Sequence, residues 1–87
     1  IALFHGARAI GGLYLRDALD ALEARSPLVR CTPCVSGPDV PPGIANGRVV
    51  DIAFDRHRDL RGWAMFVCGL PEMVHEARAR AVLAGVE

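Results

Sequence analysis

The spacing of hydrophobic and polar positions changes several times along the chain. Residues 1–4 form a short apolar run, and residues 28–35 alternate well enough for a strand. Between these two runs, apolar residues recur at helical spacing, with charged residues on the other faces. The pattern predicts an amphipathic helix over residues 13–25, which ends at Ser26-Pro27.

The middle of the chain is more polar and then becomes strongly apolar. Residues 36–47 contain three prolines and three glycines and are therefore expected to form a loop. Residues 49–54 fit either a strand or a short helix, and residues 55–61 are typical of a solvated surface turn. Residues 63–67 are an unbroken apolar run, which predicts a parallel strand covered on both faces.

A second helix is predicted from Pro71 onward. Proline suits a first helical position, because no backbone donor is lost there, and Gly85 suits the position just after the helix end. Glu76 and Arg80 form an i,i+4 pair in the favourable orientation. The apolar face of this helix consists of Val74, Ala77, Ala81 and Ala84. Strands alternate with helices along the chain, so the sequence predicts an α/β fold with a parallel sheet.

Composition narrows the class of protein. The 87 residues are 52% hydrophobic, which argues against disorder, and their formal net charge is zero. Basic residues are spread along the chain and matched by acids, so no nucleic-acid partner is expected. No apolar run reaches the roughly 20 residues that a membrane span needs, and the three cysteines form no disulfide framework. We therefore expect a cytoplasmic protein. Because the chain opens inside a strand-like run and stops just past a helix, we also expect a piece of a longer protein.

The segment 67–74, Val-Cys-Gly-Leu-Pro-Glu-Met-Val, carries the main functional signal. A buried strand that stops at Cys68-Gly69 and restarts as a helix at Pro71 makes a sharp turn at the carboxyl end of the strand. In open α/β sheets, ligands bind at that edge. Glycine lets the backbone approach a ligand closely, and exposed helix amides favour an anionic or polar ligand.

Together with this turn, three further stretches resemble the nucleotide-binding half of the ferredoxin–NAD(P)H reductase superfamily. These stretches are LFHGAR at 3–8, LYLRD at 13–17 and PCVS at 33–36, and with the turn they occur in family order. The resemblance implies that residues 1–87 are a partial NAD(P)-binding domain. Its fold would be part of a doubly wound, Rossmann-like parallel sheet that lacks its first strand.

The resemblance also implies a function for the parent enzyme, an NAD(P)H-dependent flavin oxidoreductase. Hydride would pass from NADH to FAD or FMN in a flavin domain of the same chain. Electrons would then pass to an acceptor protein or domain, which could be an iron–sulfur centre, a haem or an oxygenase. A [2Fe–2S] domain could be fused to the chain. Residues 1–87 alone are expected neither to bind flavin nor to turn over NADH.

By the same resemblance, the turn would hold the nicotinamide end of the coenzyme. Cys68 would be the catalytic-site residue and would flank the nicotinamide ring together with Gly69. Pro71 and Met73 would shape the pocket. Leu70 stands where the family more often has a second proline, a variation that we expect to be tolerated.

The adenosine end of the coenzyme would lie at the ends of the first two strands. Gly6 and Arg8 close the first strand, where an arginine can clamp a phosphate or stack on an adenine. Ser36 matches a serine that contacts the 2′-phosphate in NADPH-preferring relatives, but Gly37 stands where those relatives carry an arginine. Asp39 adds an acid nearby, so NADH is expected to be preferred over NADPH.

Two other functions remain open from the sequence. The first is a non-catalytic nucleotide-binding or regulatory α/β module. The second is a thiol-redox or metal protein built on Cys31 and Cys34. The second is disfavoured because no helix follows the pair and a strand would point the two thiols to opposite faces. No other motif supplies the four ligands of a structural zinc site, so no metal is expected. The three histidines are expected to be solvated rather than functional.

Overall fold

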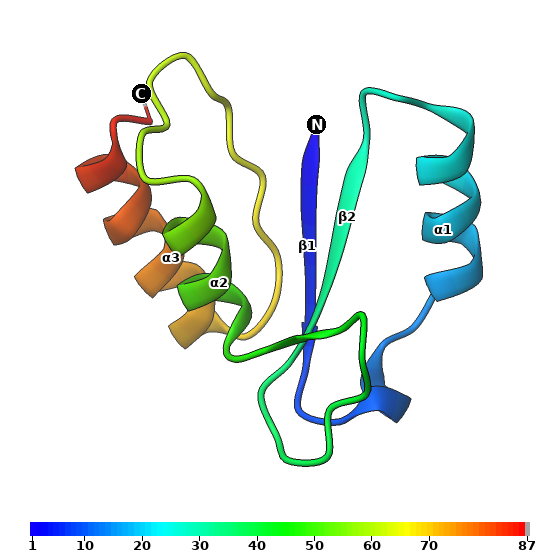
Figure 1. The fold of residues 1–87 in the computed structure, drawn as a ribbon. Coiled ribbons are helices and arrows are strands. Elements are labelled where there is room, and N and C mark those ends of the chain that lie inside the picture. Colours follow the sequence, from blue (N-terminus) through cyan, green and yellow to red (C-terminus); the bar gives the residue numbers. More distant parts are fainter. Residues whose placement is uncertain (87) are drawn as a thin grey trace. The chain divides into compact units, whose positions relative to one another are not determined.

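The computed structural model describes residues 1–86 and divides them into two compact units, residues 1–49 and residues from 50 onward. The first unit is a parallel sheet with one covering helix. Figure 1 shows β1 and β2 side by side. The sheet order is β1-β2-β3, and Ala7 at the end of β1 lies opposite Val35 at the end of β2. Its elements are β1 (Ala2–Ala7), the 3₁₀ turn η1 (Ile10–Gly12), α1 (Arg16–Arg25), β2 (Arg30–Val35) and β3 (Ala45–Asn46).

The first unit confirms the predicted strand, helix, strand order, but α1 begins three residues later than predicted. Leu13 was expected on the helix; instead it is in extended backbone and is buried in the core. Leu15 then takes a left-handed conformation, with a φ of 59°, just before the first helical residue. The chain therefore turns at residues 13–15 so that Leu13 can be buried, and the helix starts only after that turn.

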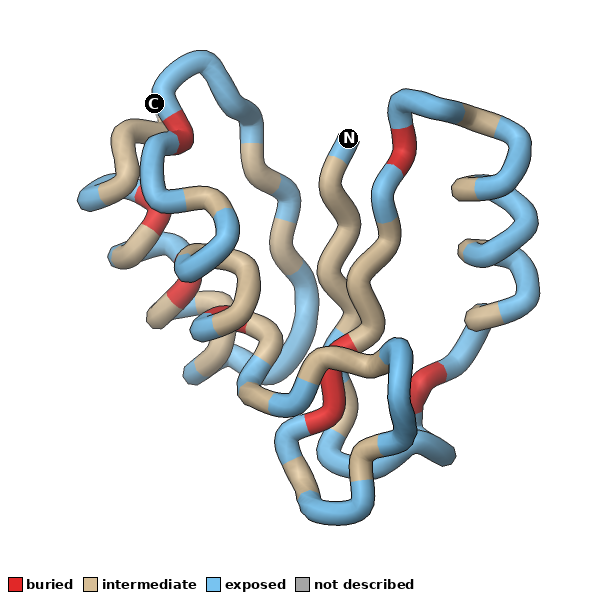
Figure 2. The backbone as a smooth tube through the Cα atoms, in the orientation of Figure 1, coloured by how far each residue is buried: buried red, intermediate tan, exposed pale blue. Residues whose placement is uncertain are grey.

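Helix α1 packs on β2 through polar contacts as well as apolar ones. A carboxylate oxygen of Glu23 accepts the backbone N–H of Cys31 at 2.6 Å, which fixes the helix end beside the start of the strand. The thiol of Cys31 lies 3.8 Å from the carbonyl oxygen of Leu19. Two residues at the carboxyl end of β2, Cys34 and Val35, are fully buried. Figure 2 shows buried backbone at this end of the strands. Part of the core of this unit therefore lies at the strand end where ligands are expected, and Leu13 and Val29 are buried elsewhere in the unit.

The second unit consists of two helices and the segment between them. Helix α2 (Val49–Arg56) resolves the ambiguity of residues 49–54 in favour of a helix, and α3 is Pro71–Ala84. The guanidinium of Arg80 on α3 binds Asp51 on α2 at 2.7 Å and lies 5.1 Å from the ring centre of Phe54. It also lies 3.5 Å from Glu76, which confirms the predicted i,i+4 pair. One arginine thus links the two helices.

The prediction of a buried strand over residues 63–67 is wrong. The segment contains no strand, and Phe66 is 95% exposed and Trp63 is 42% exposed. An apolar run forms a strand only where another strand supplies hydrogen-bond partners. Within residues 1–86, no strand pairs with residues 63–67. The predicted loop over residues 36–47 is confirmed except for its two-residue strand β3, which pairs with the end of β2.

Helix α3 ends against the loop that follows α2. Gly85 follows the helix with a φ of 104°, as predicted for its C-terminal cap, and the carbonyl oxygen of Ala84 accepts the N–H of Leu60 at 2.8 Å. In the same loop, the side chain of Asp59 accepts hydrogen bonds from the backbone and guanidinium of Arg61, and these bonds lower the pKa of its carboxyl group. The hydrogen bond between Leu60 and Ala84 holds the loop close to Gly85.

We expect Gly85→Ala to destabilise the protein more than Gly62→Ala. Both glycines have left-handed backbones, so alanine costs about 1 kcal/mol at either position. A Cβ at Gly85 would also lie 2.7 Å from Cγ of Arg61, whereas a Cβ at Gly62 would meet open space. Denaturant unfolding should therefore show a loss of about 2 kcal/mol for Gly85→Ala. Equal losses for the two variants would contradict the packing of this loop on α3.

Candidate functional site

The first candidate region lies at the carboxyl ends of β1 and β2. Hydrogen bonding between the two strands continues past their ends, because Ser36 donates its N–H to the carbonyl oxygen of Ala7 at 3.0 Å. Gly37 then donates its N–H to the carbonyl oxygen of Arg8 at 2.9 Å. Two of the predicted binding residues, Arg8 and Ser36, are therefore brought together at one strand end, and both are exposed. We call residues 7–8, 36–37 and 46–47 the strand-end site.

Asn46 completes the strand-end site and was missed by the sequence analysis. Its side-chain amide donates to the carbonyl oxygens of Val35 at 2.8 Å and Gly37 at 3.1 Å. The N–H of Gly47 donates to the same Val35 oxygen at 2.9 Å. The only sequence signal was an Asn-Gly pair, a common turn dipeptide, and it gave no indication of a contact nine or more residues away.

Gly6, another predicted binding residue, has a packing role within β1. A Cβ at this position would lie 2.6 Å from Cβ of Val49, the last residue of the first unit. That separation is far below a normal carbon–carbon contact, so the close approach of Val49 requires glycine at position 6. Whether Gly6 also approaches a coenzyme stays a prediction.

The second candidate region is the turn at residues 68–71, in the second unit. Cys68 and Gly69 are exposed, and Gly69 has a φ of 148° and is contacted by the Cε methyl of Met73. Pro71 begins α3 as predicted, and no side chain caps the helix at Leu70. The first backbone amides of a helix have no partners within it. The turn therefore offers a glycine backbone, an accessible thiol and helix amides to a polar ligand.

The structure argues against the thiol-redox alternative. Cys34 is fully buried, and burial together with the nearby carboxylates of Glu23 and Asp20 raises the pKa of the Cys31 thiol. A redox-active cysteine needs a lowered thiol pKa, which is the opposite shift. Within residues 1–86, no three His, Cys, Asp or Glu side chains are placed to hold a metal ion.

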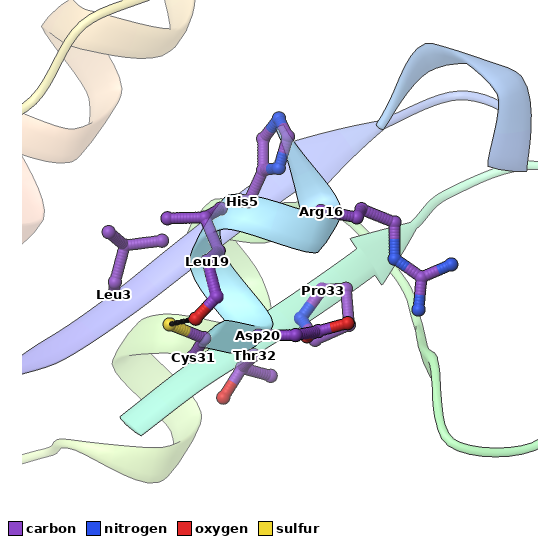
Figure 3. A pocket seen from close by; sticks show the side chains of 8 residues that line it. All are labelled: Leu3, His5, Arg16, Leu19, Asp20, Cys31, Thr32 and Pro33. Carbon is purple, nitrogen blue, oxygen red and sulfur yellow. Dashed lines mark hydrogen bonds between the residues drawn. The ribbon is translucent and has the colours of Figure 1, made fainter. Parts of the chain in front are cut away.

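A small pocket lies between α1 and the sheet (Figure 3). It has room for about one water molecule, far less than the roughly 300 Å³ or more of a typical ligand site. It cannot hold a nucleotide. The residues that line it are Leu3, His5, Arg16, Leu19, Asp20, Cys31, Thr32 and Pro33.

The expectation that all three histidines are solvated is wrong for His5. Both ring nitrogens of His5 are buried, and the ring packs edge-on against Tyr14 with centres 4.8 Å apart. Burial follows from its position on β1, under α1. His75 is exposed as expected, and His57 is half-buried and packs edge-on against Trp63.

Comparison with known proteins shows which protein family the chain belongs to. Residues 1–79 match the oxidoreductase NAD-binding domain. A relative from Ralstonia sp is the ferredoxin–NAD(P)(+) reductase component of naphthalene 1,2-dioxygenase/salicylate 5-hydroxylase systems. It is 34% identical over 74 residues, which are 85% of this chain and 23% of the relative, so the chain spans about a quarter of the relative's length. No solved structure matches the chain.

These findings confirm the resemblance to the ferredoxin reductase superfamily and the α/β, partial Rossmann-like fold. The matched residues include both the strand-end site and the turn at residues 68–71. Among the described helices, none combines the length and the apolar character that crossing a bilayer requires.

We expect the three cysteines to react with iodoacetamide at very different rates. Cys68 is exposed and should react first near neutral pH, whereas Cys31 should lag because its thiol pKa is raised. Cys34 should react only on unfolding, since it is fully buried. Mass spectrometry of peptides after timed alkylation measures the three rates, and Cys68→Ser should remove the fast phase. Labelling of Cys31 as rapidly as Cys68 would contradict the assignment.

The raised pKa of Cys31 also has a consequence for stability. The unfolded chain loses the thiol proton at a lower pH than the folded chain does, so Cys31 stabilises the fold fully below the ordinary thiol pKa of about 8.5. This contribution is lost as the pH rises from there through the folded pKa. Cys31→Ser should therefore flatten the alkaline fall of the unfolding free energy, measured by urea titration between pH 7 and pH 10. An unchanged slope would contradict this.

Proposed function

The chain belongs to the oxidoreductase NAD-binding domain family, and we propose that its parent protein is an NADH-dependent flavin oxidoreductase. We place the flavin, FAD or FMN, in another domain of the parent chain, where it would take hydride from bound NADH. The electrons would go on to an iron–sulfur protein or another acceptor of an oxygenase system. The Ralstonia relative, a reductase component named for ferredoxin, supports this acceptor class.

We assign the adenosine end of NADH to the strand-end site. The guanidinium of Arg8 is exposed at the carboxyl end of β1, and no ion pair to it is seen within residues 1–86. A guanidinium in that position can form paired hydrogen bonds to a phosphate or stack on an adenine ring. The exposed Ser36 lies beside the backbone of Arg8, because Ser36 and Gly37 donate backbone hydrogen bonds to Ala7 and Arg8.

The strand-end site also supports the preference for NADH over NADPH. A 2′-phosphate at Ser36 would need a basic partner, and the next residue is Gly37. Asp39, two residues further on, is exposed in a left-handed backbone and adds a negative charge to the loop. A ribose hydroxyl is compatible with that environment, whereas an additional phosphate would be repelled.

We assign the nicotinamide end to the turn at residues 68–71. The exposed Cys68 and Gly69 would flank the ring, and Pro71 and Met73 would shape the pocket. None of these groups is an acid or base for the reaction, so their role is to orient the ring and exclude water while the cofactors supply the redox chemistry. The single observation that carries the proposal is the family match over residues 1–79, which includes both candidate regions. The same match favours an oxidoreductase over a regulatory module.

Arg8→Ala in the complete protein should raise the Kd for NADH about tenfold, the loss expected for one charge-assisted phosphate contact. Arg25→Ala is the matched control, because Arg25 is an exposed arginine in the last turn of α1, away from the strand ends. Fluorescence titration of NADH measures both. An unchanged Kd for Arg8→Ala would remove Arg8 from the site.

Cys68→Ala should mainly slow hydride transfer. The thiol is expected to orient the nicotinamide rather than anchor the coenzyme, so the rate constant for flavin reduction should fall about tenfold while the Kd changes little. Stopped-flow reduction of the flavin by NADH separates the two quantities. Cys31→Ala is the control, and an equal effect of the two substitutions would contradict the role of Cys68.

A further inference from the structure

Asn46 and Gly37 form a relay of hydrogen bonds that ends on the backbone of Arg8. The side-chain amide of Asn46 donates to the carbonyl oxygen of Gly37 at 3.1 Å, and the N–H of Gly37 donates to the carbonyl oxygen of Arg8 at 2.9 Å. We propose that Asn46 and Gly37 are positioning residues for the coenzyme, acting through Arg8. The inference rests on the proposed function, because it takes Arg8 as a contact to NADH.

Gly37 is required at its position by the close approach of Arg8. A Cβ built on Gly37 would collide with the carbonyl oxygen of Arg8, the atom that accepts the Gly37 N–H. Backbone of this kind cannot move aside as the end of a flexible side chain can, so any side chain at position 37 must break the bond and displace Arg8. A side chain at position 37, including a basic one that would pair with a 2′-phosphate, therefore requires the backbone at Arg8 to shift.

Asn46 holds Gly37 from the other side. Its amide nitrogen faces two carbonyl oxygens, those of Val35 and Gly37, so the NH₂ group rather than the oxygen must point toward them. The Val35 oxygen also accepts the N–H of Gly47, which fixes the backbone on which Asn46 stands. The asparagine therefore ties the loop after β2 to the end of β3, and this loop in turn sets the position of Arg8.

The relay fixes the position of the Arg8 backbone, from which the side chain carrying the guanidinium extends. The side chain is exposed, so the position of the Arg8 backbone sets where the side chain begins at the strand end. A shift of that origin by even a fraction of an ångström changes the geometry of paired hydrogen bonds to a phosphate. Loss of the relay should therefore weaken NADH binding and leave the rate of hydride transfer at saturating NADH unchanged.

The test is a double-mutant cycle on NADH binding in the complete protein. Gly37→Ala should raise the Kd for NADH about fivefold to tenfold, while the rate of flavin reduction at saturating NADH stays unchanged. Gly11→Ala is the matched control, because a Cβ there meets open space and the backbone needs no glycine. In an Arg8→Ala background, Gly37→Ala should add less than a twofold change, since the group that Gly37 positions is then absent.

Asn46→Ala provides a second route if Gly37→Ala does not fold. It removes the donor to both carbonyls and should give the same pattern, a raised Kd in the native background and almost none in the Arg8→Ala background. Thermal unfolding of each variant establishes that it is folded at the temperature of the titration.

The outcomes separate the two claims. A raised Kd for Arg8→Ala with no change for Gly37→Ala or Asn46→Ala would overturn the relay and leave the proposed function intact. An effect of equal size in both backgrounds would also overturn the relay, because the residues would then act on something other than Arg8. No effect of Arg8→Ala itself would reject the assignment of Arg8, and the relay with it.

Discussion

The constraint on which the strand-end site depends is the continuation of hydrogen bonding past the ends of β1 and β2. The ladder does not stop at Ala7 and Val35 but goes on through Ser36 and Gly37 to the backbone of Arg8. This extension brings two exposed polar side chains, Arg8 and Ser36, to one edge of a parallel sheet. Asn46 reinforces this extension, because its side-chain amide donates to the carbonyl oxygens of Val35 and Gly37.

Those features of the fold that depend on local periodicity could be read from the sequence. Helix α3 begins at Pro71, ends before Gly85 and carries the Glu76–Arg80 pair, all as its spacing predicts. Features that need a distant partner could not. Residues 63–67 have the composition of a buried strand, but composition alone does not supply the neighbouring strand that would pair with them. The start of α1 was misplaced for a similar reason, since the burial of Leu13 is a tertiary contact.

The candidate site shows the same division. The sequence proposed Arg8, Ser36 and the turn at Cys68 as candidate site residues because residue types and order along the chain resemble a known family. The family match confirms the resemblance, and the site residues stay a prediction. It did not identify Asn46, whose partners lie nine and eleven residues away along the chain. The close packing against Gly6 and Gly37 could not be predicted either, because the residues next to a glycine in the sequence do not show which atoms contact it in the fold.

The most direct test of the account is a titration of the protein with NADH, followed at its backbone amides by NMR. If NADH binds as proposed, the amides of Ser36 and Gly37 shift with the same Kd as those of Cys68 and Gly69, one group for each end of the coenzyme. Shifts confined to residues around the small pocket beneath α1, with these four amides unmoved, would contradict it.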